Sequence, residues 1–63
     1  MKNNLKKLRL RQKMTQSHLA ALLKCSVRTV RRYERGETRI PGEILLVLSR
    51  IFGVSPIEIY EEG

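Results

Sequence analysis

The chain has 63 residues, of which 41% are hydrophobic and 30% are charged, and its formal net charge at pH 7 is +7. Residues 1–35 contain eleven lysines and arginines and one glutamate, a net charge of +10, whereas residues 36–63 contain two basic and five acidic residues, a net charge of −3. The apolar share excludes a disordered chain, the length excludes a second core, and the basic half predicts a polyanionic partner, with nucleic acid ahead of an anionic membrane.

A first helix is predicted near the start of the chain. Asn3 or Asn4 can cap it, because their side-chain oxygens can accept hydrogen bonds from the free N–H groups of a first helical turn. Leu5 and Leu8, three residues apart, form its apolar stripe. Leu10 lies off this stripe, so we expect its side chain to be exposed.

A second helix is predicted to follow Thr15, which is a favourable N-cap residue. Leu19, Ala20 and Leu23 form its buried stripe, and the small side chain of Ala20 allows another helix to cross closely. Lys24-Cys25 then makes a turn.

A third helix is predicted from its cap, Ser26, to about Arg35, and Gly36 ends it because glycine adopts a left-handed backbone without strain. At about 100° per residue, Val30 and Tyr33 point to the core. The opposite side carries what we call the arginine face, which consists of Arg28, Arg32 and Arg35 with Arg31 on its flank.

The arginine face indicates contact with nucleic acid. Four like charges on one short helix repel one another, so an ordinary solvated face, which is the alternative, would intersperse acidic residues. A guanidinium group can bond bidentately to guanine O6 and N7 or clamp a phosphate, and an α-helix fits the major groove. Val27 begins this face and could contact a thymine methyl group.

Two more helices are predicted after a loop that Pro41-Gly42 ends. The fourth runs from about Glu43 to Phe52, with Leu45, Leu48 and Phe52 towards the core, and Gly53 ends it. Residues 55–58, Ser-Pro-Ile-Glu, form a capping box with proline at the first helical position, which predicts a short fifth helix.

The fourth helix carries a second apolar stripe of Ile44, Val47 and Ile51, and a helix that is apolar on two sides is usually buried on both. Two explanations are open. One is a homodimer sealed by this stripe, with Ile57 and Tyr60 as contributors. The other is burial of the stripe within the monomer.

No enzyme chemistry is expected. Cys25 is the only cysteine and His18 the only histidine, so neither a disulfide framework nor a metal site is predicted, and no serine or threonine has a base in a triad-like pattern. We expect no cofactor and no small-molecule substrate. A charged N-terminal segment and short apolar runs predict no signal peptide, no membrane partner and a cytoplasmic location.

Taken together, the motifs resemble the phage-repressor and Cro superfamily of helix-turn-helix, Xre-like DNA-binding domains. The resemblance covers about residues 5–60 and rests on Leu8-Arg9, Met14-Thr15-Gln16-x-x-Leu19-Ala20, Ser26-x-x-Thr29-Val30-x-x-Tyr33-Glu34-Arg35-Gly36, Leu45-x-x-Leu48 and Phe52-Gly53-Val54-Ser55. It implies one all-α domain over residues 1–63, a compact five-helix bundle of the lambda-repressor-like type whose second and third helices form the helix-turn-helix. It also implies a sequence-specific, repressor-like regulator of transcription, bacterial or phage-encoded, that binds palindromic double-stranded operators as a homodimer.

The resemblance also implies roles for individual residues. Those that would read bases are Val27, Arg28 and Arg32. Those that would contact the DNA backbone are Gln16, Ser26, Arg31, Arg35, Thr38 and Arg39. Arg9 and Glu34 match a salt bridge between the first and third helices, and the alternative is two unrelated surface charges.

Two positions depart from the family pattern, because Lys13 and Lys24 stand where the family has glycine before and after the second helix. A lysine with positive φ is uncommon and costs roughly 1 kcal/mol. The geometry of the turn between the second and third helices is therefore expected to differ in detail.

Two other functions compete with DNA-binding regulation. A protein-interaction module, such as the antitoxin of a toxin–antitoxin pair, would explain the second apolar stripe of the fourth helix. Sequence-blind binding to RNA or to an anionic membrane would call for aromatic stacking residues, but the aromatic content is 5% and tryptophan is absent.

Overall fold

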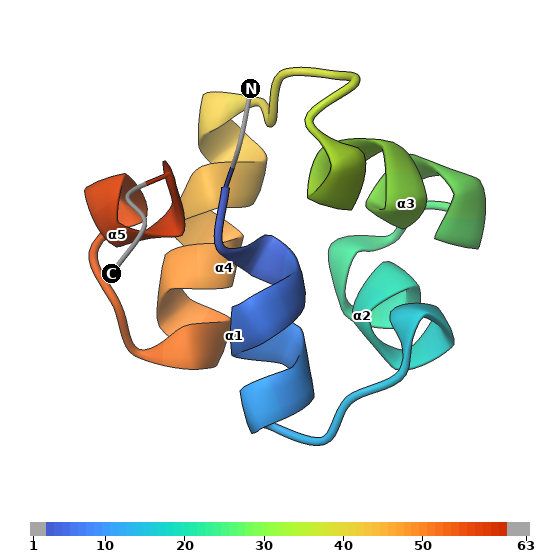
Figure 1. Cartoon of the computed structure of the whole chain (residues 1–63), viewed down its shortest axis with the longest axis horizontal. Helices are drawn as coiled ribbons and strands as arrows, with labels where there is room; N and C mark the ends of the chain where they lie inside the picture. The colour runs from blue at the N-terminus through green and yellow to red at the C-terminus, as the bar shows by residue number, and fades with distance from the viewer. Residues whose placement is uncertain (1–2, 61–63) are drawn as a thin grey trace.

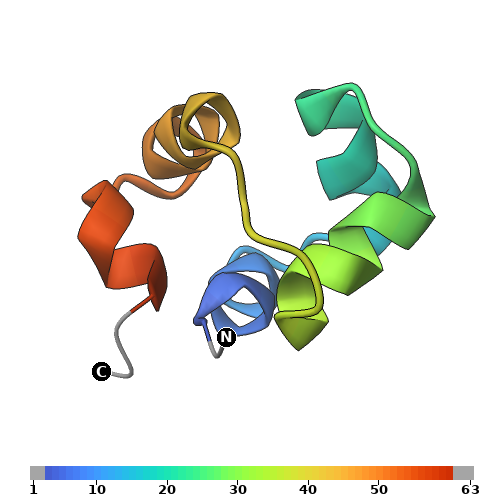
Figure 2. The same ribbon diagram turned by 90° about the horizontal axis from the view of Figure 1, so that it is seen from above.

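The computed structural model of the chain describes residues 3–60 and forms five α-helices there, with no strand. The helices are α1 (Leu5–Arg11), α2 (Gln16–Leu23), α3 (Val27–Arg35), α4 (Gly42–Phe52) and α5 (Pro56–Tyr60). Figure 1 shows α1 in the middle, α2 and α3 on one side of it and α4 and α5 on the other, and Figure 2 shows the same division from above. The expected all-α bundle is confirmed; residues 1–2 and 61–63 of the expected domain lie outside the described residues.

Local capping explains where the helices begin. Thr15 Oγ1 accepts a hydrogen bond from the backbone N–H of His18 at 3.0 Å, and Ser26 Oγ accepts one from the N–H of Thr29 at 3.1 Å. Before α5, the Glu58 carboxylate accepts from the N–H of Ser55 at 2.6 Å, as a capping box requires.

The two asparagines at the start of α1 have different roles. Asn4 is the N-cap residue, but its side chain makes no capping bond. Asn3 Oδ1 accepts from the N–H of Leu5 at 3.0 Å, while Asn3 Nδ2 donates to the carbonyl of Tyr33 at 2.7 Å. Asn4 Nδ2 instead donates to the carbonyl of Glu58 at 2.8 Å. The start of α1 is thereby tied to the end of α3 and to α5.

Both lysines that stand where the resemblance implies glycine adopt the left-handed backbone. Lys13 and Lys24 each have φ of 57°, the two non-glycine residues with positive φ among residues 3–60. Lys24 ends α2 with ψ of 44°, and Gly36 ends α3 with φ of 72°. Lys24 thus ends α2 in the same left-handed region in which Gly36 ends α3.

The core lies between the two sides of the bundle and receives side chains from all five helices. Its buried hydrophobic residues are Leu5, Leu8, Leu19, Ala20, Leu23, Val30, Tyr33, Ile40, Leu48, Phe52 and Ile59. Leu45, expected to be buried, is half-buried at the edge of this core, whereas Leu10 is 55% exposed, as expected. Ile40 comes from the loop between α3 and α4 and seals the core there.

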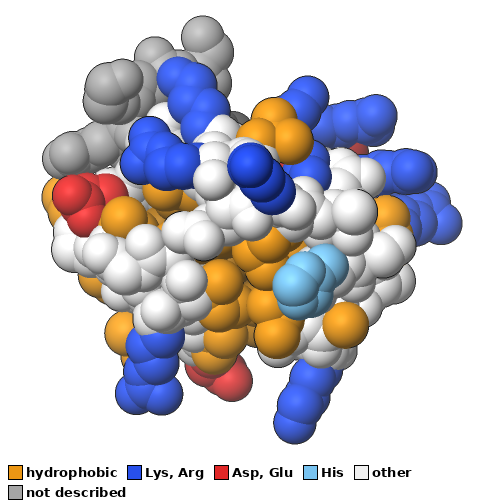
Figure 3. All heavy atoms as spheres, turned by 90° about the horizontal axis from the view of Figure 1, so that it is seen from below, with side chains coloured by type: hydrophobic (Ala, Val, Ile, Leu, Met, Phe, Trp, Pro, Cys, Tyr) orange, Lys and Arg blue, Asp and Glu red, His pale blue; other side chains and the backbone are white. Residues whose placement is uncertain are grey.

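The second stripe of α4 is partly covered within the monomer. Ile44 and Ile51 are half-buried and pack against the core, whereas Val47, at 36%, is the most exposed member of the stripe. More exposed apolar side chains lie elsewhere, with Leu46 at 58% and Leu22 at 45%. Figure 3 shows hydrophobic side chains gathered on the face seen from below, beside the histidine. No helix within residues 3–60 is long and apolar enough to cross a bilayer.

Candidate nucleic-acid interface

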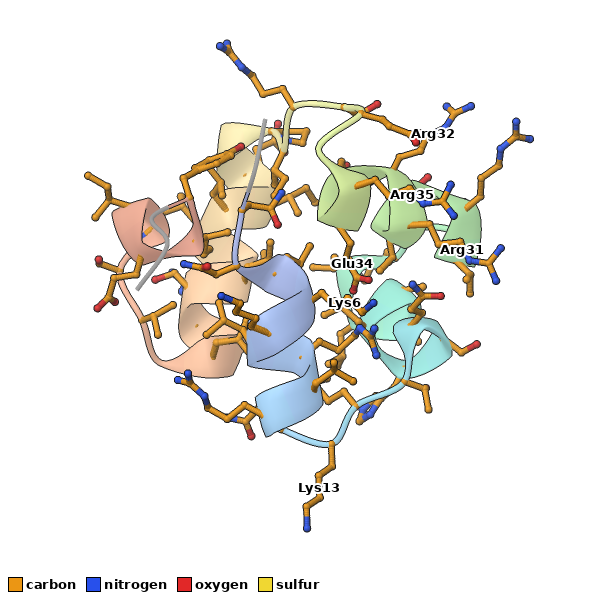
Figure 4. All side chains as sticks on the ribbon, in the orientation of Figure 1. Lys6, Lys13, Arg31, Arg32, Glu34 and Arg35 are labelled. Carbon is orange, nitrogen blue, oxygen red and sulfur yellow. The ribbon has the colours of Figure 1, made fainter. Side chains whose placement is uncertain are left out.

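The arginine face is the outer side of α3. All four arginines are exposed, whereas Val30 is 0% and Tyr33 7% exposed on the side that packs into the core. In Figure 4 the labelled Arg31, Arg32 and Arg35 extend from α3 away from the bundle. A shallow depression of about 360 Å³ lies among the four arginines and Glu37. α3 thus presents a strongly cationic surface fixed from behind by the core.

A buried ion pair fixes the end of α3 against α1. Arg9 Nε donates to Glu34 Oε2 at 2.6 Å, and Arg9 Nη2 reaches Glu34 Oε1 at 3.4 Å. The two side chains are only 8% and 5% exposed. Arg9 Nη1 also donates to the carbonyl of Met14 at 2.8 Å, so this guanidinium joins α1, the loop after it and α3. Such a pair is held by several charge-assisted hydrogen bonds rather than by attraction alone.

The side chain of Gln16 extends this network towards the arginine face. Gln16 Nε2 donates to Glu34 Oε1 at 3.1 Å, and Gln16 Oε1 accepts from Arg31 Nε at 3.2 Å. Gln16 on α2 and Arg31 on α3, for which the family resemblance implies backbone contacts, are therefore hydrogen-bonded to each other. The network opens on a depression of about 280 Å³ lined by Lys6, Gln16, Arg31, Glu34 and Arg35.

Lys6 is a cation at this surface that the sequence analysis missed. It is exposed on α1 and lines the same depression as Arg31 and Arg35, and Figure 4 places it beside Glu34. The spacing could have revealed it, because Lys6 precedes Arg9 by three residues and so lies on the same side of α1. Lys13, by contrast, lies at the far end of the molecule from α3 in Figure 4.

The loop between α3 and α4 carries the two remaining backbone-contact candidates, Thr38 and Arg39, both of which are exposed. Their neighbour Ile40 anchors the loop in the core, and its N–H donates to the hydroxyl of Tyr60 at 3.3 Å. Tyr60, a candidate for the dimer interface, is thus half-buried and partly committed to holding this loop.

The two candidates at the start of α3 are less free than the arginines. Val27 is half-buried and packs partly against the core. The Ser26 hydroxyl caps α3 and also shares a hydrogen bond with Thr29 Oγ1 at 3.0 Å. The Ser26 hydroxyl therefore already has two hydrogen-bond partners within α3.

Cys25 and Tyr33, which lie behind the arginine face, add no charge to it at neutral pH. Burial raises the pKa of the Cys25 thiol from its ordinary value of 9.0. Burial, and to a smaller extent the neighbouring Cys25, raises the pKa of Tyr33 from 10.0. No group of three or more potential metal ligands occurs within residues 3–60.

Comparison with known proteins agrees with this geometry. The family model described as helix-turn-helix matches residues 5–59. The crystal structure of a transcriptional regulator from Listeria innocua superposes with a TM-score of 0.84 at 26% sequence identity. That match covers 100% of this chain and 64% of the regulator, so the chain spans less than two thirds of that protein. A search of curated proteins finds no match. The chain belongs to the Cro/C1-type helix-turn-helix family of DNA-binding domains.

Proposed function

We propose that this member of the Cro/C1-type helix-turn-helix family is a sequence-specific, repressor-like regulator of transcription that places α3 in the major groove of double-stranded DNA. The arginine face carries this proposal, because four exposed arginines stand on one side of α3 while its other side is buried. A helix of this kind fits the major groove, and guanidinium groups suit both guanine edges and phosphates. The name of the Listeria innocua regulator supports the same reading.

Within this interface we assign base reading to the N-terminal part of α3, through Val27, Arg28 and Arg32. Arg28 and Arg32 are exposed and one helical turn apart, so both can face the groove together. Backbone contacts fall to the residues around them, which are Gln16, Ser26, Arg31, Arg35, Thr38 and Arg39. Phosphate contacts position the protein, and base contacts specify the sequence.

Binding measurements on two arginine variants test this division. In vitro selection on random duplexes first gives the preferred operator. Arg28→Ala should then relax base preference at one operator position and cost about 1–3 kcal/mol, because a bidentate base contact is lost. Arg39→Ala should weaken binding to all sequences alike and reduce the salt slope by about 1, as expected for a phosphate contact.

Lys13→Gly is the matched control, because it removes one positive charge far from α3 and suits the left-handed backbone at that position. It should change neither base preference nor affinity by a comparable amount. If Arg28→Ala and Arg39→Ala gave identical profiles across sequences and salt concentrations, the assigned division would be wrong. A wild-type protein that bound all duplexes equally would refute sequence-specific regulation itself.

We further propose that two copies act together on a palindromic operator. A two-fold dimer sets its two recognition helices into successive major grooves about 34 Å apart. Ile44, Val47, Ile51, Ile57 and Tyr60 are the interface candidates. Of these, Ile57 is 63% and Val47 36% exposed, so they have most area left to bury. Sedimentation tests the proposal, and a monomer at high micromolar concentration would contradict it.

A second candidate function is a protein-interaction module such as an antitoxin. The observation that favours it is the exposure of Leu46 and Leu22, which lie outside the expected dimer stripe. A purified chain that stays monomeric and ignores operator-length DNA would support this function over the first. Under either function the chain acts by binding, without catalysis, and we propose that it does so in the cytoplasm.

A further inference from the structure

A continuous chain of polar contacts crosses the three helices behind the proposed DNA-binding surface. It runs from Arg9 on α1 to Glu34 on α3, then to Gln16 on α2 and back to Arg31 on α3, with donor–acceptor distances of 2.6, 3.1 and 3.2 Å. We call these four residues the polar chain. Its inner end is buried, with the Arg9 and Glu34 side chains 8% and 5% exposed, and its outer end, Arg31, is exposed.

The chemistry of the two neighbours fixes the orientation of the Gln16 amide. On one side stands a carboxylate that can only accept, and on the other a guanidinium that can only donate. Turning the amide over would place N–H against N–H and oxygen against oxygen. Gln16 therefore has one stable orientation, set by Glu34, and in it the amide oxygen holds Arg31.

We infer that Gln16 and Glu34 are positioning residues for Arg31, so that the polar chain presents this arginine to a DNA phosphate already ordered. The inference rests on the proposed DNA binding and refines one of its assignments, since Gln16 then acts on the DNA backbone through Arg31 and not through a contact of its own. The bond to Gln16 uses Arg31 Nε, which leaves the two Nη groups for a bidentate phosphate contact. An arginine that is already held loses less rotamer freedom when it binds.

The salt dependence of DNA binding separates this role from a direct contact. Each cation that neutralises a phosphate contributes about 0.9 to the slope of log affinity against log salt concentration. Gln16 is neutral, so a glutamine that merely donates to a phosphate would affect affinity and leave the slope unchanged. A glutamine that holds Arg31 in place would change the slope when it is removed.

The experiment measures affinity at several salt concentrations for the selected operator duplex and for a random-sequence duplex of equal length. Arg31→Ala should lower the slope by about 1. Gln16→Ala should weaken both duplexes about two- to tenfold and lower the slope by a comparable part of one unit. The double variant should match Arg31→Ala alone, because both substitutions remove the same contact. As a control, Gln16→Ala and Arg35→Ala should combine additively, because Arg35 lies outside the polar chain.

Glu34→Gln provides a test of opposite sign. Removing a negative charge beside a DNA-binding surface should by itself tighten binding, whereas loss of the positioning effect should weaken it and lower the slope. Circular dichroism verifies that the variant is folded at the assay temperature. If Glu34→Gln is unfolded, NMR spectroscopy of the DNA-free protein provides the test. The side-chain amide resonances of Gln16 should shift when Arg31 is replaced by alanine.

The possible failures are distinguishable. The positioning role alone is overturned if the wild-type protein binds DNA and Gln16→Ala keeps the wild-type salt slope. The same holds if the Gln16 amide resonances do not shift on Arg31→Ala. A wild-type protein without salt-dependent binding to either duplex overturns the proposed function, and this inference with it.

Discussion

Replacing Lys24 by glycine should stabilise the protein. Glycine usually destabilises a helix where it replaces a residue with helical backbone geometry, but the backbone of Lys24 is left-handed. Lys24 ends α2 with φ of 57° and ψ of 44°, and it is exposed. A residue with a Cβ pays roughly 1–2 kcal/mol for this conformation, and glycine avoids that cost. The greater conformational freedom of glycine in the unfolded chain offsets about 0.4–1 kcal/mol of this gain in folding stability.

At the midpoints of these two ranges the expected net gain is about 0.8 kcal/mol, which raises the melting temperature by roughly 3–6 °C in a domain of this size. Thermal unfolding followed by circular dichroism measures it directly. Lys13→Gly should act in the same direction, because its φ is also 57°.

Lys7→Gly is the matched control. It removes the same side chain and the same charge from an exposed position inside α1, where glycine costs about 1 kcal/mol. Opposite signs at Lys24 and Lys7 would show that backbone conformation decides the outcome. A lower melting temperature for Lys24→Gly, similar to that of Lys7→Gly, would refute the reasoning.

Three further predictions concern stability. Arg9→Met should lower the free energy of unfolding in urea by about 3–5 kcal/mol, because it leaves the Glu34 carboxylate, which is 5% exposed, without its partner. A loss below about 1 kcal/mol would contradict the role of the ion pair. Leu48→Ala should cost about 2–5 kcal/mol at a site with 0% exposure, whereas Leu46→Ala, at 58%, should change stability by less than about 1 kcal/mol. Burial raises the folded-state pKa of Cys25 and Tyr33, so the unfolded chain loses these protons at lower pH than the folded protein does. The free energy of unfolding should therefore be constant below pH 9.0 and decline above it. Cys25→Ala should reduce the decline.

The positions of the helices could be predicted because their signals are local. Thr15 and Ser26 each satisfy an N–H three residues later, and Gly36 ends α3 by its own backbone preference. The arginine face also followed from sequence, since a short helix with Val30 and Tyr33 on one side leaves the other side to solvent.

What the sequence left open depends on how segments cross in space. Ile40 lies in a loop without periodicity, so nothing in the sequence separated it from its exposed neighbours. The area of Ile44 and Ile51 that is left for a partner depends on how α4 packs against the core, and this packing half-buries both side chains. The contact between Gln16 and Arg31 depends on side-chain rotamers on two helices, and spacing along the chain carries no information about it.

The attachment of α3 to α1 limits how far the helix-turn-helix can be treated as a portable module. Residues 15–36 are contiguous, yet the end of α3 depends on the guanidinium of Arg9 and on the Asn3 amide that bonds the Tyr33 carbonyl. An excised segment of α2 and α3 would lose both partners and expose the Glu34 carboxylate to water. A graft of this arginine face onto another scaffold would therefore have to include α1 together with α2 and α3.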